Sequence, residues 1–272
     1  MSHYIAATNI STGWLEAMEH LRTRGGKESN LVVAIAPSED IVENQRIRRV
    51  FDSFVQVHES PRVRRIRKVA DTIFPSDFYK PSLGGKARDH LYKMQRLARK
   101  IESRFMPGGT YFDRLIDWPQ ADKEPINQLE SKVQRMKKQW QESIRNGNAY
   151  ELALSDVEDD ATVDDALRIQ NPTRDKSIMG FPCLSHISLT LFEGRLDLTA
   201  LYRNQHFVTK AYGNYVGLSE LQHFISREVG CVPGELVCVA THADAEFAGE
   251  VGKRNICRLI DECRDAISTT TQ

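Results

Sequence analysis

The sequence predicts an α/β protein in which amphipathic helices and short buried strands follow one another along the chain. Helical spacing of apolar residues is clearest over residues 87–105. Two apolar runs of strand length, LVVAI at residues 31–35 and LVCVA at residues 236–240, predict buried strands. Residues 186–192 and 195–202 alternate apolar and polar side chains, which predicts a hairpin with one buried face. With 272 residues, 40% of them hydrophobic, the chain is long enough to bury a sizeable core.

The first elements are a helix, a strand and a basic segment. Residues 14–24 have helical spacing and end at Gly25-Gly26, and the strand at 31–35 ends before Pro37. Residues 46–68 are dense in arginine, with the runs RIRR and PRVRRIRK. Charge runs usually form a solvated and partly helical surface, and the alternative is a patch that faces a phosphate.

The middle of the chain predicts two helices and an irregular region. The helix over 87–105 stops at Pro107-Gly108-Gly109, and a second helix with a charged outer face covers 126–144. Residues 155–165, SDVEDDATVDD, are acidic enough to form an exposed loop, which Asn171-Pro172 prolongs.

After the hairpin, polar residues predict a loop that leads to Asn214 and then to a helix that ends at Gly230. Pro233-Gly234 predicts a turn into the strand at 236–240, and a last helix covers 256–267. We find no internal repeat and no convincing linker, so we expect residues 1–272 to form a single domain.

Composition excludes several classes of protein. The 37 basic and 37 acidic residues balance, so the net charge gives no reason to expect nucleic acid or an anionic membrane as partner. No apolar run approaches the roughly 18 residues of a membrane span, and the N-terminus lacks the layout of a secretory signal. The five cysteines show no CxxC spacing, which argues against disulfides and a zinc site. We therefore expect a cytoplasmic protein without a bound metal.

One long segment carries several landmarks in a fixed order. It is GFPCLSHISLTLFEGRLDLTALYRNQHFVTKAYGNYVGLSELQHFISREVGCVPGELV, residues 180–237. A Pro-Cys pair opens a strand, a strand ending in LY precedes an arginine, and a loop leads to an asparagine before a helix. This segment resembles the catalytic half of thymidylate synthases. The resemblance implies that Cys183 is the nucleophile, that Arg203 binds phosphate and that Asn214 recognises the base.

The resemblance continues more weakly upstream and adds further site residues. Glu102, in ESRFMPGG, is similar to the glutamate that orders water and moves protons around the base. Asn204 and His206 occupy substrate-binding positions of the family's pattern. His242 and Asp244 take the place of the family's His-x-Tyr pair, which holds the sugar hydroxyl, if two residues are deleted in the alignment. The fold implied is a large mixed sheet flanked by helices, and a homodimer with the sheets stacked back to back is expected.

Several departures from the family pattern concern the folate side of the site. The loop with the family's catalytic tyrosine is missing between Trp118 and Ile126, and the arginines that the partner subunit donates are absent. His206 replaces an aspartate that holds the pterin, and Lys210 replaces a glycine. The closing C-terminal segment has no recognisable counterpart.

The retained residues suit covalent catalysis on a pyrimidine. A thiolate that adds to C6 makes C5 nucleophilic toward a one-carbon electrophile, and a guanidinium beside the sulfur stabilises the thiolate. The resemblance thus implies a C5 methyl- or hydroxymethyl-transferase acting on a pyrimidine nucleotide, with 5,10-methylenetetrahydrofolate as carbon donor. Loss of folate contacts fits hydroxymethylation or an unusual substrate.

Other interpretations stay open. The chain could be a nucleotide-binding or regulatory relative without folate chemistry, or Cys183 could perform different chemistry on a nucleotide or modified base. Cys183 could equally be a small core residue, Asn214 a helix N-cap and Glu102 a solvated helix residue. An asparagine side chain can accept from N3–H and donate to O4, so Asn214 favours a uracil-type base over cytosine. The sugar and the number of phosphates stay open.

Overall fold

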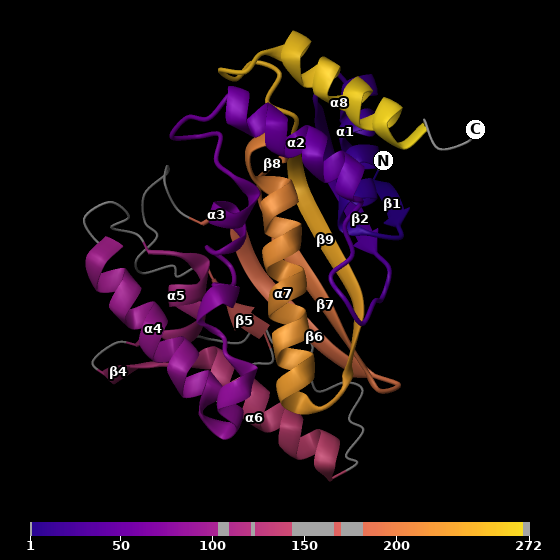
Figure 1. Ribbon diagram of the computed structural model, residues 1–272. Coiled ribbons are helices and arrows are strands. Elements are labelled where there is room, and N and C mark those ends of the chain that lie inside the picture. Colours follow the sequence, from indigo (N-terminus) through magenta and orange to yellow (C-terminus); the bar gives the residue numbers. More distant parts are fainter. Residues whose placement is uncertain (1, 103–108, 121–122, 143–165, 170–181, 269–272) are drawn as a thin grey trace.

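The computed structural model describes residues 2–102, 109–120, 123–142, 166–169 and 182–268 (Figure 1). Its centre is a seven-stranded mixed sheet in the order β1-β2-β9-β7-β6-β5, with β8 paired to β9. The strands of this sheet are β1 His3–Ala7, β2 Lys27–Ile35, β5 Ala166–Arg168, β6 Leu184–Phe192, β7 Arg195–Tyr202, β8 Gln205–His206 and β9 Val232–Asp244. A second sheet pairs β3 Trp118–Gln120 with β4 Lys123–Ile126.

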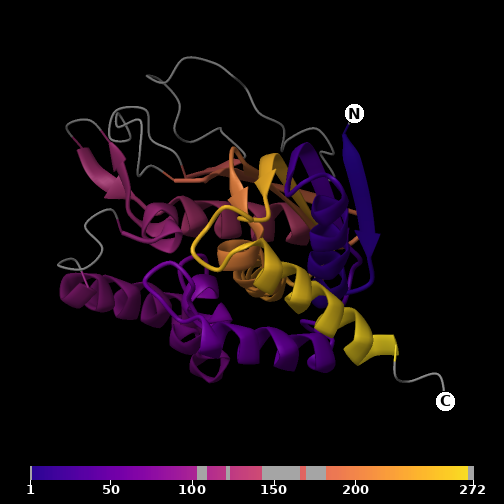
Figure 2. The ribbon, with the colours of Figure 1, turned by 90° about the horizontal axis from the view of Figure 1, so that it is seen from above.

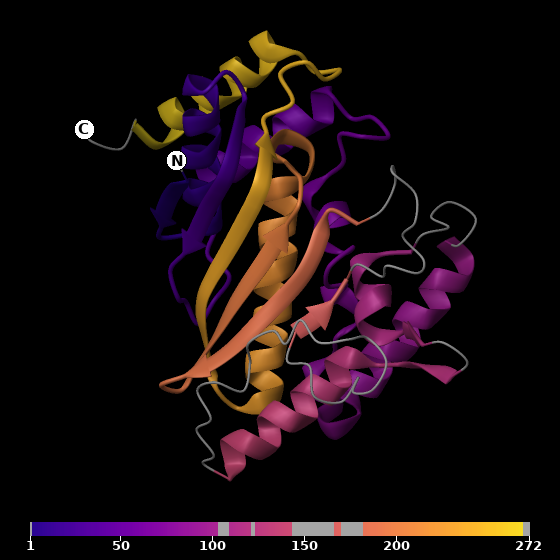
Figure 3. The same cartoon turned by 180° about the vertical axis from the view of Figure 1, so that it is seen from behind.

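Helix α7 lies across one face of the large sheet, and further helices pack around it. The α-helices are α1 Ile10–Thr23, α2 Gln45–Val57, α3 Ile66–Ala70, α4 Ala87–Glu102, α5 Tyr111–Ile116, α6 Gln128–Gln141, α7 Tyr212–Val229 and α8 Lys253–Ser268. Short 3-10 helices cover Ser76–Phe78 and Pro81–Lys86, and a π-helix, η3 Phe207–Ala211, leads directly into α7. Seen from above, α7 lies between the sheet and a layer with α2 and α4 (Figure 2). From behind, no described helix crosses β9, β7 and β6 (Figure 3).

The order of β7, α7 and β9 positions the site. Because β7 and β9 are parallel neighbours, the chain must cross over the sheet between them, and α7 makes this crossover. The β7 strand ends at Tyr202, beside the start of β6 at Leu184. Residues at the start of β6 therefore lie close to the residues that join β7 to α7.

Most elements expected from periodicity are confirmed, with shifted ends. The helix expected over 14–24 begins earlier, at Ile10, because the Asn9 side chain caps it by accepting from the Thr12 backbone N–H at 3.0 Å. The basic segment 46–68 contains α2 and the start of α3. The β6–β7 hairpin and the strand within β9 lie where the alternation and the apolar run predict them.

Two local predictions are wrong, and several short elements were missed, among them α5, β3, β4 and β5. Pro233-Gly234 is not a turn, since it lies inside β9 at a register shift where Asp197 accepts from the Glu235 N–H at 2.7 Å. The loop predicted after β7 contains the two-residue strand β8. The five-residue edge strand β1 was missed. The acidic stretch 155–165 and Asn171-Pro172 lie outside the described residues.

No helix in the part of the chain that the structure describes is long and apolar enough to cross a membrane. Among the same residues, no group of three or more His, Cys, Asp and Glu side chains could hold a metal ion.

Candidate active site

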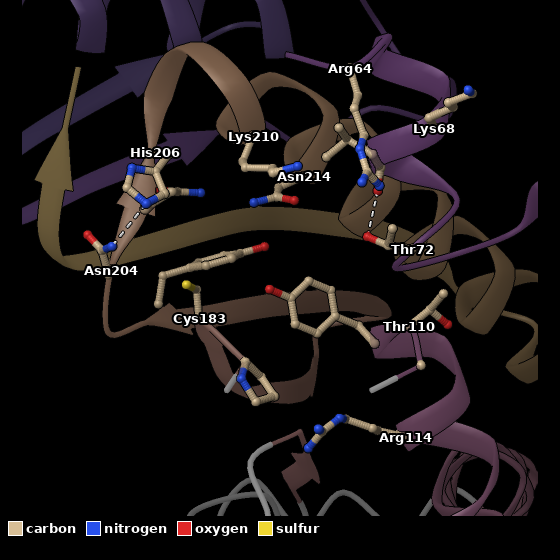
Figure 4. Close-up of a pocket in the computed structure, with 16 residues that line it drawn as sticks. Arg64, Lys68, Thr72, Thr110, Arg114, Cys183, Asn204, His206, Lys210 and Asn214 are labelled. Atoms are coloured by element: carbon tan, nitrogen blue, oxygen red, sulfur yellow. Dashed lines mark hydrogen bonds between the residues drawn. The ribbon is translucent and has the colours of Figure 1, made fainter. Parts of the chain in front are cut away.

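A cavity of about 290 Å³ opens where β6 begins and where η3 joins α7. Its walls come from α3, the start of α5, the Pro182–Cys183 segment, the end of β7 with β8, and the first turn of α7. Figure 4 shows Cys183 on one side of this cavity, with Lys210 and Asn214 on the opposite side. Segments that are far apart in the sequence thus meet at one site.

Cys183 is half-buried at the cavity wall, directly before β6. Burial raises the pKa of its thiol, because the thiolate is poorly solvated there, and the positive charges of Arg203 and Lys210 offset part of this rise. The net direction is upward. The two cations alone therefore do not produce a low thiol pKa in the ligand-free protein.

Arg203 does not line the cavity but holds the segment that carries Cys183. Its Nε donates to the Pro182 carbonyl oxygen at 2.9 Å, and its backbone N–H donates to the Cys183 carbonyl oxygen at 3.0 Å. Its own carbonyl oxygen accepts from Thr241 Oγ1 at 2.8 Å. These bonds tie the Pro182–Cys183 segment to the end of β7.

Asn214 lines the cavity from the first turn of α7 and is 4% exposed. The N-cap of α7 is Ala211, without a side-chain cap, so Asn214 does not act as the helix N-cap. Its side chain makes no hydrogen bond to another described residue. A buried carboxamide without a partner among the described residues is available to a ligand.

Asn204 and His206 also line the cavity, and one ring nitrogen of His206 forms a hydrogen bond with the Asn204 amide. Asn204 Nδ2 lies 3.2 Å from His206 Nε2, whereas Asn204 Oδ1 and His206 Nδ1 are buried without a hydrogen-bond partner (Figure 4). Glu246 Oε1 lies 3.8 Å from His206 Nδ1, beyond hydrogen-bond range. The Glu246 carboxylate instead accepts from the Val208 and Thr209 backbone N–H groups at 3.0 and 2.8 Å.

His242 and Asp244, which the resemblance also implies, are not among the described residues that line the cavity. His242 is exposed on β9. Asp244 pairs with Lys27 at 3.6 Å and accepts from the Glu246 N–H at 2.6 Å, although its strand lies in register beside His206. Glu102 ends α4, and its side chain lies outside the described residues.

Comparison with solved structures finds a similar protein, whereas the two comparisons by sequence find none. No protein-family model matches the sequence, and no curated protein matches it. Among solved structures, thermostable thymidylate synthase A from Bacillus subtilis superposes with a TM-score of 0.53 over 93% of this chain and 84% of that chain. The chain has a thymidylate synthase-like fold. The expected fold class, a mixed sheet flanked by helices, is confirmed. The sequence identity is 10%, so this likeness concerns the fold and not the reaction.

Polar residues that the sequence analysis did not select also line the site. Tyr202 and Gln205 are 0% and 2% exposed, and the Tyr202 hydroxyl and both amide atoms of Gln205 have no hydrogen-bond partner among the described residues. Eight buried side-chain N or O atoms in the described part of the chain lack a hydrogen-bond partner, and five of them belong to residues that line the cavity. The polar run that follows LY in the sequence was the available signal, but it was interpreted as a loop.

Tyr111 is a further residue that the sequence did not reveal. It lines the cavity at the start of α5, a short helix that Thr110 caps by accepting from the Asp113 N–H at 3.1 Å. Burial and the neighbouring negative charge of the Cys183 thiolate raise the pKa of its phenol to about 12, so the phenol stays protonated. Its hydroxyl group is available as a proton donor beside Cys183.

Proposed function

We propose that this protein is a thymidylate synthase-like one-carbon transferase that adds the Cys183 thiolate to C6 of a uracil-type nucleotide and forms a methyl or hydroxymethyl group at C5. The observation that carries this proposal is the shared cavity of Cys183 and Asn214. One residue supplies a nucleophile and the other an unpaired carboxamide, on a fold of the thymidylate synthase type.

The proposed reaction begins with the sulfur. The S–C6 bond forms, and the electron pair of the C5–C6 double bond moves to give an enolate over C5 and O4. C5 then bonds to a one-carbon electrophile at the oxidation level of formaldehyde, the C5 proton leaves to a base or water, and breaking the S–C6 bond returns the thiolate and leaves a hydroxymethyl group. A methyl product requires, in addition, a hydride donor that supplies two electrons. Tyr111 is placed to donate a hydrogen bond in this region, because its phenol remains neutral.

Asn214 would select the base. Its oxygen accepts from N3–H and its nitrogen donates to O4, which is the pattern that uracil presents. Its burial strengthens the selection, since a mismatched ligand would leave buried polar groups unpaired.

A second candidate is a nucleotide-binding relative without folate chemistry. The direction of the Cys183 pKa favours it, because burial leaves the thiol protonated near neutral pH until something else stabilises the thiolate. Capture of a nucleotide without any change at C5 would support this alternative.

Methylenetetrahydrofolate is the carbon donor that the resemblance implies, but the described residues of the cavity fit it poorly. His206, paired to Asn204, and the ammonium of Lys210 stand where the resemblance calls for a carboxylate and a glycine. The cavity is at the lower end of the about 300–1,000 Å³ usual for one small ligand. We therefore expect folate to bind weakly after the nucleotide.

We propose a homodimer through the face of the sheet that no described helix covers (Figure 3), with residues 1–272 as one domain. Val237, Val239 and Leu201 alternate with buried neighbours on β9 and β7, and they remain half-exposed. Val239→Glu should shift the mass measured by light scattering from dimer to monomer. A wild-type monomer at all concentrations would contradict this.

A covalent trap tests the proposed function. The 5-fluoro derivatives of UMP and dUMP, with and without methylenetetrahydrofolate, should leave an adduct on the peptide that contains Cys183, detected by mass spectrometry. Cys183→Ser should abolish the adduct. Cys257→Ser, which removes another half-buried thiol, should not affect it. Tight nucleotide binding without any adduct would favour the binding relative.

A further inference from the structure

Two glycines let α3 approach the start of α7 unusually closely. A Cβ at Gly213 would lie 2.5 Å from Val69 Cβ and 2.9 Å from the Ile66 carbonyl oxygen. A Cβ at Gly217 would lie 2.6 Å from the Ala70 carbonyl oxygen. Since real Cβ atoms do not approach that closely, the backbone of α3 can rest on this helix only because both positions are glycine.

Ion pairs then fix α3 in place. Arg67 Nη1 and Nη2 donate to the two carboxylate oxygens of Glu220 on α7, at 2.5 and 2.6 Å, and Arg67 Nε donates to Asp71 at 2.8 Å. A bidentate pair defines orientation as well as distance. The residues on either side of Arg67 therefore have a defined relation to Asn214, which lies one residue after Gly213.

Two of these residues place positive charge at the cavity. Arg64 is half-buried and lines it beside Asn214, whereas Lys68 lies at its rim and is exposed (Figure 4). Lys210, from η3, lines the same cavity. The two neighbours Arg62 and Arg65 are exposed and do not line it.

Arg64 and Lys210 have no carboxylate within ion-pair distance in the described part of the chain, although the charge of Glu246 acts on Lys210. Arg64 Nε donates to the Pro61 carbonyl oxygen at 2.9 Å, and neither side chain forms an ion pair with a described residue. Other arginines of this protein, such as Arg48 and Arg88, have carboxylates within 3.1 Å. Burial and the like charge of Arg64 lower the pKa of Lys210, and the negative charges of Glu246 and Cys183 offset part of this shift. An anion between the two cations would oppose the lowering further.

We propose that Arg64 and Lys210, with Lys68 at the rim, form a subsite for the phosphate group of the nucleotide, built entirely within one chain by the docking of α3 on α7. The nucleotide is taken from the proposed function, whereas the phosphate chemistry comes from the cations themselves. A guanidinium donates two parallel hydrogen bonds to phosphate oxygens, and an ammonium adds a point charge. In this proposal, Arg64 and Lys210 bind the phosphate that the resemblance assigned to Arg203. Arg203 instead holds the Pro182–Cys183 segment through hydrogen bonds.

Calorimetric titration with UMP, dUMP, uridine and inorganic phosphate tests this subsite. Arg64→Ala and Lys210→Met should each weaken binding of both monophosphates by about 10-fold or more, as expected for a lost hydrogen bond to a charged group. Binding of uridine should stay unchanged. Arg62→Ala and Arg65→Ala are the matched controls, and they should bind all four ligands as the wild type does.

The docking of α3 has its own test. Gly217→Ala should displace α3 and weaken monophosphate binding, while uridine binding changes little. Glu220→Gln, which weakens the Arg67 pair without adding bulk, should give a smaller effect in the same direction. Circular dichroism and thermal unfolding of each variant establish that it is folded.

Several outcomes would overturn the inference. One is wild-type monophosphate affinity in both Arg64→Ala and Lys210→Met, with the loss found in Arg203→Ala instead. Another is an equal loss for uridine and UMP. If the proposed function alone were wrong, the results would differ from these. Phosphate binding would still depend on Arg64, but the protein would show no preference for pyrimidines and would form no adduct at Cys183.

Discussion

Arg203 Nε donates to the carbonyl oxygen of Pro182 at 2.9 Å, so the arginine that follows β7 holds the residue that precedes the candidate nucleophile. The backbone N–H of Arg203 adds a bond to the Cys183 carbonyl oxygen at 3.0 Å. Arg203 therefore has two separable effects on Cys183. It restrains the backbone around the sulfur, and its charge lowers a thiol pKa that burial has raised.

Two substitutions of Arg203 should separate these effects. Arg203→Ala removes both, so the pKa of Cys183 should rise further and alkylation by iodoacetamide should need a higher pH than in the wild type. Arg203→Lys keeps a positive charge but loses the Nε donor, so the pH profile should move less. The measurement is the alkylation rate of the Cys183 peptide against pH, with Cys257 in the same sample as internal reference. An unchanged profile in Arg203→Ala would show that its charge does not act on the thiol.

Asn214→Asp should change the choice of base. A carboxylate accepts from the cytosine amino group and, if protonated, donates to N3, whereas the carboxamide matches uracil. The wild type should bind UMP and dUMP better than CMP and dCMP, and the variant should reverse this order. Because an amide can flip and recover part of the match, the discrimination should be moderate. Equal affinity for all four nucleotides in both proteins, measured by competition, would remove Asn214 from base recognition.

Gln205 and Gln222 form a matched pair, since both are 2% exposed. Gln222 Nε2 donates to the Leu196, Gly234 and Glu235 carbonyl oxygens at 2.7 to 3.2 Å, whereas neither amide atom of Gln205 has a hydrogen-bond partner in the described part of the chain. Gln222→Met should lower the free energy of unfolding by about 1–3 kcal/mol, the usual penalty for buried groups left unpaired.

Gln205→Met should leave the free energy of unfolding unchanged or raise it, while nucleotide affinity falls. Denaturant unfolding and ligand titration of both variants give the comparison. A loss of stability in Gln205→Met equal to that in Gln222→Met would mean that Gln205 serves the fold and not a ligand.

The sequence predicts this fold best where one face of an element is buried and the other is solvated. In the β6–β7 hairpin, apolar and polar residues alternate along each strand, so the sequence itself indicates which side chains are buried. Helix α7 is different, because its first turns are buried on all sides against the sheet and α3. The apolar pattern was therefore recognised only from Leu218, six residues after the helix begins at Tyr212.

The residues of the site were also predictable only in part from the sequence. Cys183 and Asn214 were selected because they belong to an ordered set of landmarks, and they line one cavity. Arg64 could not be singled out from its arginine-rich run, because its position depends on how Val69 and Ala70 contact two glycines far along the chain. His242 and Asp244 were placed by an alignment with a deletion, and they lie outside the cavity.

Exchange of the C5 hydrogen of a uracil nucleotide tests the central claim without any carbon donor. If the Cys183 thiolate adds to C6, the enolate takes up a deuteron from D₂O at C5. Elimination with loss of the original proton then returns a deuterated nucleotide. The C5–H signal of UMP or dUMP in the proton NMR spectrum should decay with the wild-type protein and with Cys257→Ser, and it should persist with Cys183→Ser. A C5–H signal that persists with the wild type, at concentrations where the nucleotide is shown to bind, would contradict the account.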